Sequence, residues 1–228
     1  MAKQAPSAPD SHSVAVEDYI KHIWKLLNQG RRATTKAIAE RTGLGRGTVS
    51  GMLKQLAERG LVDHQPYRGV HLTAKGERLA LRIIRRHRLI ELFLVKTLEL
   101  GWEQVHDDAE RMEHAVSDEL VDHIDRYLGH PQVDPHGAPI PDASGGIQRQ
   151  DFRPLAELAP GETGRVRRVS DHEDWFLKHL EERGITLETN VKVMDVDPFG
   201  MIHIRIGKRD AHLAREAAMR IQVATESM

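Results

Sequence analysis

The chain contains no cysteine among its 228 residues. The absence of thiols excludes a disulfide framework, a cysteine nucleophile, an iron–sulfur cluster and a thiolate metal site. Any metal ion must therefore be held by histidine and carboxylate side chains. The sequence also lacks a run of about 18 to 20 apolar residues, the length that a membrane-spanning helix needs. We expect a soluble, cytoplasmic protein in which residues 1–15 form a disordered tail.

The chain has little excess charge of either sign, with a formal net charge of −1, but the charges are unevenly distributed. Residues 17–90 contain 16 Lys and Arg against 6 Asp and Glu, whereas residues 91–150 contain 4 against 13. A basic block followed by an acidic block predicts a polyanion-binding unit joined to a part that attracts cations.

Apolar periodicity in the basic block predicts a winged helix-turn-helix. Residues 16–27, 36–41 and 46–59 have helical spacing, and glycines separate the second helix from the third. Residues 61–73 form two extended runs around a Pro-Tyr-Arg-Gly turn, which is typical of a hairpin wing. An isolated basic helix is usually only a solvated face, but here charge, helix-turn-helix and hairpin coincide and favour DNA binding. The candidate DNA contacts are Arg46, Thr48, Ser50, Lys54, Lys36 and Arg68.

The rest of the chain changes from helical spacing to alternation. We expect long helices over residues 74–94 and 104–128, followed by a linker rich in proline and glycine over residues 132–150. Alternating residues at 164–169, 191–196 and 201–207, with a short helix over 174–183, predict a small β-barrel-like domain.

Histidines and carboxylates recur at helical offsets in the acidic block. If residues 104–128 form one helix, His106, Glu110, Glu113 and His114 share one face. His87 and Glu91 are also four positions apart, as are Asp18 and His22. A single pair of this kind is more often a surface hydrogen bond. Four such side chains on one face, with no lysine among them, favour a divalent metal ion.

With these motifs the chain resembles the diphtheria toxin repressor family of iron- and manganese-dependent bacterial transcription regulators, over about residues 16–223. The motifs are Ala39-Glu40-Arg41, Gly47-Thr48-Val49-Ser50, Glu58 to Val62, Leu72 to Gly76, Arg86 to Glu91, Val105 to His114 with Ser117-Asp118, and Asp134 to Pro141. The resemblance implies a mainly α protein with a small β domain. The implied parts are a winged helix-turn-helix DNA-binding domain (16–80), a helical metal-binding and dimerisation domain (81–145), a linker (146–152) and an SH3-like β-barrel (153–228).

The resemblance also implies two metal sites. One maps onto Asp18, Glu110, Glu113 and His114, and the other onto His87, Glu91 and His106 with His172 and Glu173 as candidate ligands from the SH3-like domain. In the iron-responsive branch the positions of Asp18 and Glu110 are methionine and cysteine. Two carboxylates there favour Mn²⁺, with Fe²⁺ or another first-row divalent metal as the alternative. Lys21 stands where the manganese branch often has a further carboxylate, which argues against a close two-metal cluster.

These features together predict a Mn(II)-dependent transcription regulator and not an enzyme. We expect a homodimer that binds palindromic double-stranded operator DNA and represses metal-uptake genes, with metal binding fixing the dimer in its DNA-binding geometry. The alternatives are an Fe(II)-responsive regulator, a regulator that senses an organic ligand, and a binuclear metal hydrolase. The hydrolase is disfavoured because no nucleophile or glycine-rich phosphate loop accompanies the candidate ligands.

Overall fold

The computed structural model of the protein describes residues 12–65, 69–148, 150–170 and 174–225. The chain divides into two compact units, Met1–Ile84 and Arg85–Met228. The boundary falls inside the longest helix, α4 (Ala74–Leu98), so that this helix contributes to both units. No helix in the described ranges is long and apolar enough to cross a membrane.

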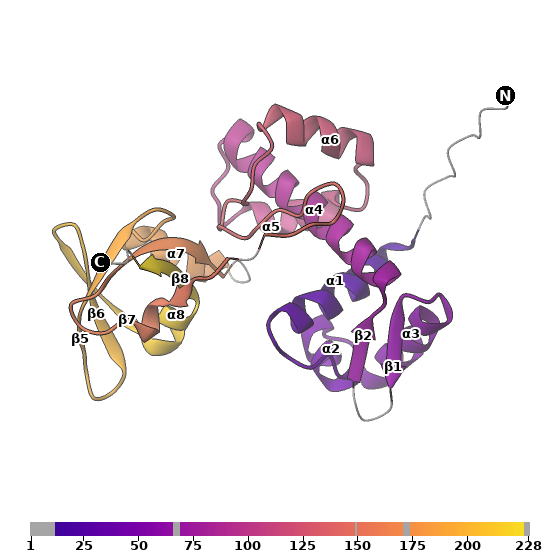
Figure 1. Ribbon diagram of the computed structural model, residues 1–228, viewed down its shortest axis with the longest axis horizontal. Helices are drawn as coiled ribbons and strands as arrows, with labels where there is room; N and C mark the ends of the chain where they lie inside the picture. The colour runs from indigo at the N-terminus through magenta and orange to yellow at the C-terminus, as the bar shows by residue number, and fades with distance from the viewer. Residues whose placement is uncertain (1–11, 66–68, 149, 171–173, 226–228) are drawn as a thin grey trace. The chain divides into compact units, whose positions relative to one another are not determined.

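The first unit is a winged helix-turn-helix (Figure 1). It consists of α1 (Val14–Asn28), α2 (Thr35–Thr42), α3 (Arg46–Glu58) and the antiparallel strands β1 (Val62–Gln65) and β2 (Gly69–Leu72). The three helices and the hairpin predicted from the sequence are confirmed. Their apolar positions form a core that includes Ile20, Ile23, Ile38, Val49, Leu53 and Leu56.

Local signals fix both ends of α2 and so the position of the turn before α3. The hydroxyl of Thr34 accepts a hydrogen bond from the backbone N–H of Ala37 at 3.1 Å and so caps the start of α2. Gly43 ends this helix in the left-handed region, with φ +69°. The chain can therefore reverse within three residues and begin α3 at Arg46.

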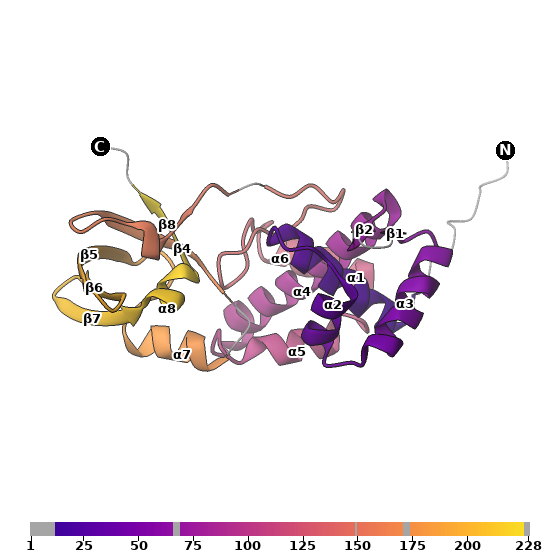
Figure 2. The same cartoon turned by 90° about the horizontal axis from the view of Figure 1, so that it is seen from below.

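The helical part of the second unit differs from the sequence-based prediction. One helix over residues 104–128 was expected, and this prediction is wrong, because the structure has α5 (Val105–Met112) and α6 (Asp118–Tyr127). The second helix restarts because the hydroxyl of Ser117 accepts the backbone N–H of Leu120 at 3.2 Å, with Asp118 and Glu119 in the first turn. Figure 2 shows α5 as a separate helix running beside α4.

The predicted linker over residues 132–150 is also wrong in its first half, because residues 133–141 are folded into the unit. Asp134, His136, Ala138 and Ile140 are buried. Oδ1 of Asp134 accepts the backbone N–H groups of His136 and Ala138, at 2.8 and 2.9 Å. These two bonds close a local turn. The sequence of this segment has no helical or strand period, so its burial was not predicted.

The C-terminal part is an antiparallel sheet of six strands in the order β3-β8-β4-β5-β6-β7. The strands are β3 (Arg153–Pro154), β4 (Thr163–Val169), β5 (Asn190–Val196), β6 (Met201–Ile206), β7 (Arg209–Ala214) and β8 (Ile221–Thr225). A short 3-10 helix (Leu155–Glu157), α7 (Asp174–Glu182) and α8 (Arg215–Met219) complete it. The apolar side of α7 packs on the sheet through Phe176, Leu177 and Leu180 (Figure 2). The three strands and the helix predicted here are confirmed, whereas β3, β7 and β8 were not predicted.

Candidate metal centre and nucleic-acid interface

A buried cluster of histidines and carboxylates lies between α4 and α5. His87 and Glu91 are one turn apart on α4, and His106 and Glu110 are one turn apart on α5. Glu91 is completely buried and His87 is 3% exposed. Burying a carboxylate in a protein core is costly unless partners compensate it, so Glu91 requires cationic or hydrogen-bonding neighbours.

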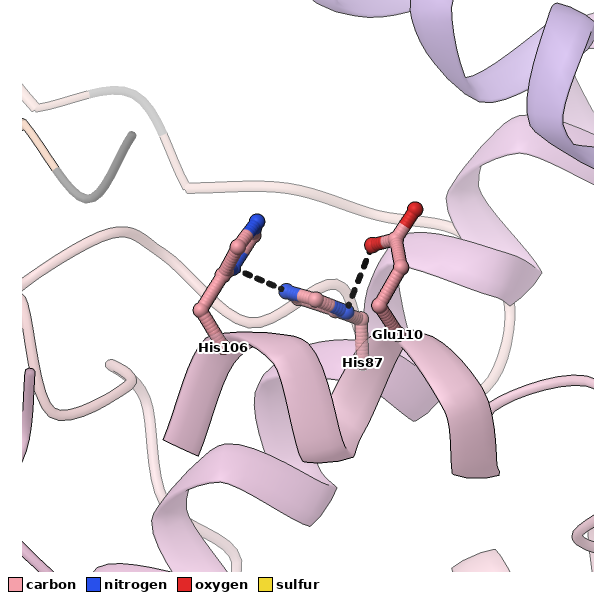
Figure 3. Close-up of side chains that lie close together, drawn as sticks. All are labelled: His87, His106 and Glu110. Carbon is pink, nitrogen blue, oxygen red and sulfur yellow. Dashed lines mark hydrogen bonds and ion pairs between the residues drawn. The ribbon is translucent and has the colours of Figure 1, made fainter. Parts of the chain in front are cut away.

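His87 is the centre of the cluster. Its Nε2 lies 2.9 Å from Oε1 of Glu91 and 3.1 Å from Nδ1 of His106, and its Nδ1 lies 3.6 Å from Oε2 of Glu110. Figure 3 shows the imidazole of His87 between His106 and Glu110. In the turn after α5, Glu113 is completely buried and its Oε2 lies 2.6 Å from Nδ1 of His87. His114 follows, with Nε2 3.3 Å from Oε1 of Glu113.

Residues 133–141 bring two further groups to Glu91. Nδ1 of His136 lies 3.9 Å from Oε2 of Glu91, and Asp134 completes a group whose ligand atoms all lie within 4.8 Å of one another. Nε of Arg88 lies 3.4 Å from Oδ2 of Asp134. Asp134 and His136 were not predicted as ligands from the sequence, because their segment lacks a helical or strand period and was expected to be a linker. The motif from Asp134 to Pro141 contains both residue types and was the available signal.

The electrostatics of Glu91 keep its carboxyl group ionised. Burial by itself raises the pKa of this group, but the positive charge of His87 and hydrogen bonds from His106 and His87 lower it further than burial raises it. The net result is a Glu91 pKa well below its ordinary value of 4.5. Oε2 of Glu91 has no hydrogen-bond donor in the described part of the chain. A buried, ionised oxygen without a donor suits a divalent cation.

The residue types of the cluster fit a first-row divalent metal. His87, His106 and Glu110 offer ligand atoms that all lie within 4.8 Å of one another, as do those of Glu91, Asp134 and His136. Imidazole nitrogen and carboxylate oxygen are the donors that such metals take from proteins lacking thiolates. Neither group contains sulfur, in agreement with the absence of cysteine from the whole chain.

The predicted ligands are placed as follows. Glu110 was assigned with Glu113 and His114, but it also groups with His87 and His106 of the other predicted site. The two predicted sets therefore meet at His87. Asp18 lies half-buried on α1 in the other unit. His172 and Glu173 lie outside the described residues.

The candidate DNA-binding residues lie on the outer side of the helix-turn-helix. Arg46, Thr48, Ser50 and Lys54 of α3 are exposed, whereas Val49, Leu53 and Leu56 face the core. Lys36 of α2 is also exposed and forms an i,i+4 pair with Glu40 at 3.7 Å. Arg68 lies outside the described residues. The start of α3 thus presents small polar and basic side chains to solvent, as a recognition helix does.

Known protein families match all three parts of the chain. Residues 13–70 match the N-terminal DNA binding domain of the iron dependent repressors, residues 73–142 match their metal binding and dimerisation domain, and residues 153–225 match the FeoA domain. The diphtheria toxin repressor of Corynebacterium efficiens is 32% identical over 191 residues, which cover 78% of this chain and 82% of that protein.

Two further relatives extend over almost the whole chain. The iron-dependent repressor IdeR of Mycobacterium leprae is 30% identical over 222 residues, covering 91% of this chain and 95% of that protein. The solved structure of a manganese-dependent transcriptional repressor in complex with manganese is 42% identical, with a TM-score of 0.85. The match covers 92% of this chain and 99% of the other.

The winged helix and the buried histidine–carboxylate cluster define a metal-dependent, DNA-binding transcription regulator, not an enzyme. The chain belongs to the diphtheria toxin repressor family of iron- and manganese-dependent regulators. Its DNA-binding and dimerisation domains imply operator DNA and a second copy of the chain as partners.

Proposed function

We propose that the protein is a Mn(II)-activated repressor of metal-uptake genes that binds a palindromic operator as a homodimer. The observation that carries this proposal is the buried cluster around His87, which offers only imidazole and carboxylate donors. Carboxylate oxygens are hard donors that suit Mn²⁺, whereas a thiolate or thioether ligand would favour softer metals. The similarity to a manganese-dependent repressor in complex with manganese supports the same metal.

The proposed ligands fall into two sets. The first is Asp18, Glu110, Glu113 and His114, and the second is His87, Glu91 and His106, completed by His172 and Glu173. A bound Mn²⁺ would supply the positive charge that balances these carboxylates. Lys21 is completely buried on α1 and lies three positions after Asp18. Because it adds a buried positive charge there, we propose a single ion next to Asp18 and not a close pair.

The DNA-binding step depends on the spacing of two recognition helices. In a symmetric dimer, the two copies of α3 must lie about 34 Å apart to enter successive major grooves of a palindromic site. Arg46, Thr48 and Ser50 would read base edges, and Lys36, Lys54 and Arg68 would hold phosphates.

Two glycines on α3 support close approach to DNA. A Cβ added at Gly47 or Gly51 would meet nothing within 4 Å, so packing inside the protein does not require glycine at either position. Both are exposed on the side that carries Thr48 and Ser50. Helix interiors disfavour glycine by about 1 kcal/mol relative to alanine. We infer that the missing side chains let the helix backbone approach the DNA, with part of the specificity coming from DNA shape.

Operator binding at fixed salt tests the proposal. Fluorescence anisotropy with candidate promoter fragments should show tight binding with Mn²⁺, weaker binding with Fe²⁺ or Zn²⁺, and none with a chelator. The Glu110→Gln protein should lose the response to Mn²⁺, while the matched surface variant His123→Gln should keep it. Strongest activation by Fe²⁺ would select the iron-responsive alternative. Binding that ignores both metal and chelator would contradict metal regulation altogether.

A further inference from the structure

The turn between α5 and α6 (residues 113–117) carries two of the proposed metal ligands, Glu113 and His114. It belongs to neither helix, since α5 ends at Met112 and α6 begins at Asp118. Connecting segments are more mobile than the helices that they join. Two ligands in such a segment keep a fixed geometry only if other parts of the fold hold the segment in place.

Arg86 makes such contacts from α4. It is buried and directly precedes His87 on this helix. Its Nη1 donates to the backbone carbonyl oxygen of Glu113 at 3.4 Å. Its Nε and Nη2 both donate to Oδ1 of Asp118, at 3.1 and 2.6 Å. One guanidinium therefore bonds to the first residue of the turn and to the residue that follows it.

The bond to the carbonyl of Glu113 acts on both ligands because the peptide unit is planar. This carbonyl and the backbone N–H of His114 belong to the same plane, so a donor that fixes one fixes the orientation of the other. The carbonyls at the end of a helix also lack a partner within the helix, and a positive charge beside them is favourable. Arg86 thus stabilises the end of α5 in the arrangement that places Oε2 of Glu113 2.6 Å from Nδ1 of His87.

We infer that Arg86 is a positioning residue for the buried cluster. Its guanidinium is a cation without a lone pair to offer, so it binds no metal ion itself. It acts by holding the turn on which Glu113 and His114 lie. Hydrogen-bonding groups behind metal ligands typically account for about 10- to 100-fold in metal affinity. The inference rests on the proposed function, in which these two residues bind Mn²⁺.

Arg85 provides a matched control. It is the preceding residue of α4 and is also buried. Its Nη2 bonds to Asp122 and Asp125 of α6, at 3.3 and 3.2 Å. Both arginines therefore join α4 to α6, but the bonds of Arg85 go to the middle and the end of α6. Loss of either guanidinium should lower the stability of the protein, whereas only the loss of Arg86 should disturb the ligands in the turn.

Hydrogen exchange in the metal-free, full-length protein tests whether Arg86 orders the turn. The backbone N–H groups of Glu113, Ala115 and Val116 bond to carbonyls of α5 at 2.9 to 3.1 Å and report this order. In Arg86→Gln they should exchange faster than in the wild type, whereas in Arg85→Gln they should keep their protection. Equal exchange in all three proteins, or the same loss of protection in both variants, would overturn the inference.

Electron paramagnetic resonance of Mn²⁺ then measures the effect on the metal, because the signal of free Mn²⁺ gives the affinity and the spectrum of the bound ion reports its ligand geometry. Arg86→Gln should bind Mn²⁺ about 10- to 100-fold more weakly and alter the spectrum of the bound ion. Arg85→Gln should match the wild type in both. Wild-type Mn²⁺ binding by Glu113→Gln would contradict the proposed ligand set itself. Loss of Mn²⁺ by Glu113→Gln, with wild-type affinity and spectrum in Arg86→Gln, would leave that set standing and overturn the role of Arg86.

Asp118→Asn tests the same contact from its other side and keeps the buried arginine in place. The side chain of Asp118 is 52% exposed, so this change leaves the core intact. It removes the charge that anchors Arg86 and should weaken Mn²⁺ binding and the protection of the turn in the same direction. Glu119→Gln removes a carboxylate from the same first turn of α6 and is its control. Equal Mn²⁺ affinities of these two folded variants would contradict the inference.

Discussion

Nδ1 of His87 lies 2.6 Å from Oε2 of Glu113, although the sequence assigns these two residues to different metal sites. Nε2 of the same imidazole lies 2.9 Å from Oε1 of Glu91. One ring therefore contacts a carboxylate from each predicted ligand set. Because the two sets share this residue, we expect binding at one of them to affect the other.

The first prediction concerns His87 itself. Replacing it with glutamine removes the shared imidazole, so His87→Gln should weaken Mn²⁺ binding at both ligand sets and not only at the one to which the residue was assigned. We expect a loss of about 10- to 100-fold in affinity at each. Isothermal titration calorimetry resolves the two binding events. A variant that loses one event and keeps the other at wild-type affinity would show that the two sites are independent.

The second prediction concerns Gly137, which adopts φ +84° and lies against the backbone of β4. A Cβ at this position would overlap the carbonyl oxygen of Arg167. We expect Gly137→Ala to lower the free energy of unfolding by about 2–4 kcal/mol through steric overlap and backbone strain. It should also weaken metal binding, because His136 is the preceding residue.

A matched glycine separates the two causes. Gly129 has φ +76°, but a Cβ there would meet nothing within 4 Å. Gly129→Ala should therefore cost only the backbone term, about 1–2 kcal/mol, and leave metal binding unchanged. Urea unfolding monitored by fluorescence measures both variants. Equal losses would mean that the contact between residue 137 and β4 contributes nothing.

The third prediction follows from the low pKa of Glu91. Because its folded pKa lies below the ordinary value of 4.5, ionisation of this group stabilises the native state fully above that pH. The contribution is lost as the pH falls from about 4.5 through the folded pKa. The unfolding free energy of the metal-free wild type should thus fall more steeply as the pH drops below about 4.5 than that of Glu91→Gln. Urea titrations at several pH values test this, and parallel curves would contradict the assigned shift.

The fourth prediction separates phosphate contacts from base contacts on α3. Lys54→Gln should weaken binding to all sequences and reduce the slope of log K against log salt by about one. Thr48→Val should change the preference among operator variants and leave the salt slope unchanged. Lys192→Gln, an exposed change on the C-terminal sheet, serves as the control. A wild-type salt slope in the Lys54→Gln protein would show that Lys54 does not contact a DNA phosphate.

Local sequence patterns were sufficient for the elements whose boundaries depend on local forces. Thr34 caps α2 and Gly43 ends it, and both residues are visible in the sequence as helix signals. The offset of four between His87 and Glu91 gave the correct geometry because both lie within one unbroken helix. For Glu113 and His114 the expected single helix was wrong, since α5 ends at Met112 and Ser117 begins a new helix. The backbone N–H of Glu113 still bonds to the carbonyl of Ala109, which keeps Glu113 in contact with His87.

The part of the site that the sequence did not reveal depends on tertiary contacts. His136 lies in a segment with no helical or strand period, and it is held near Glu91 by distant groups. Its Nε2 hydrogen-bonds to the carbonyl oxygen of Trp102 at 2.9 Å, and its own carbonyl accepts the N–H of Val169 at 2.9 Å. No local pattern records contacts between residues 30 or more positions apart. The strand β7, which follows β6 after a two-residue turn, was missed for a local reason, because small Ala211 weakens its alternation.

The central claim is that metal binding and operator binding are coupled, and the most direct measurement is the Mn²⁺ affinity of the protein with and without saturating operator DNA. Coupling between two ligands is reciprocal, so operator DNA must raise the Mn²⁺ affinity by the same factor by which Mn²⁺ raises the operator affinity. Typical coupling free energies correspond to roughly 5- to 150-fold. A matching increase in both titrations is the expected result. A Mn²⁺ affinity unchanged by operator DNA would contradict the account.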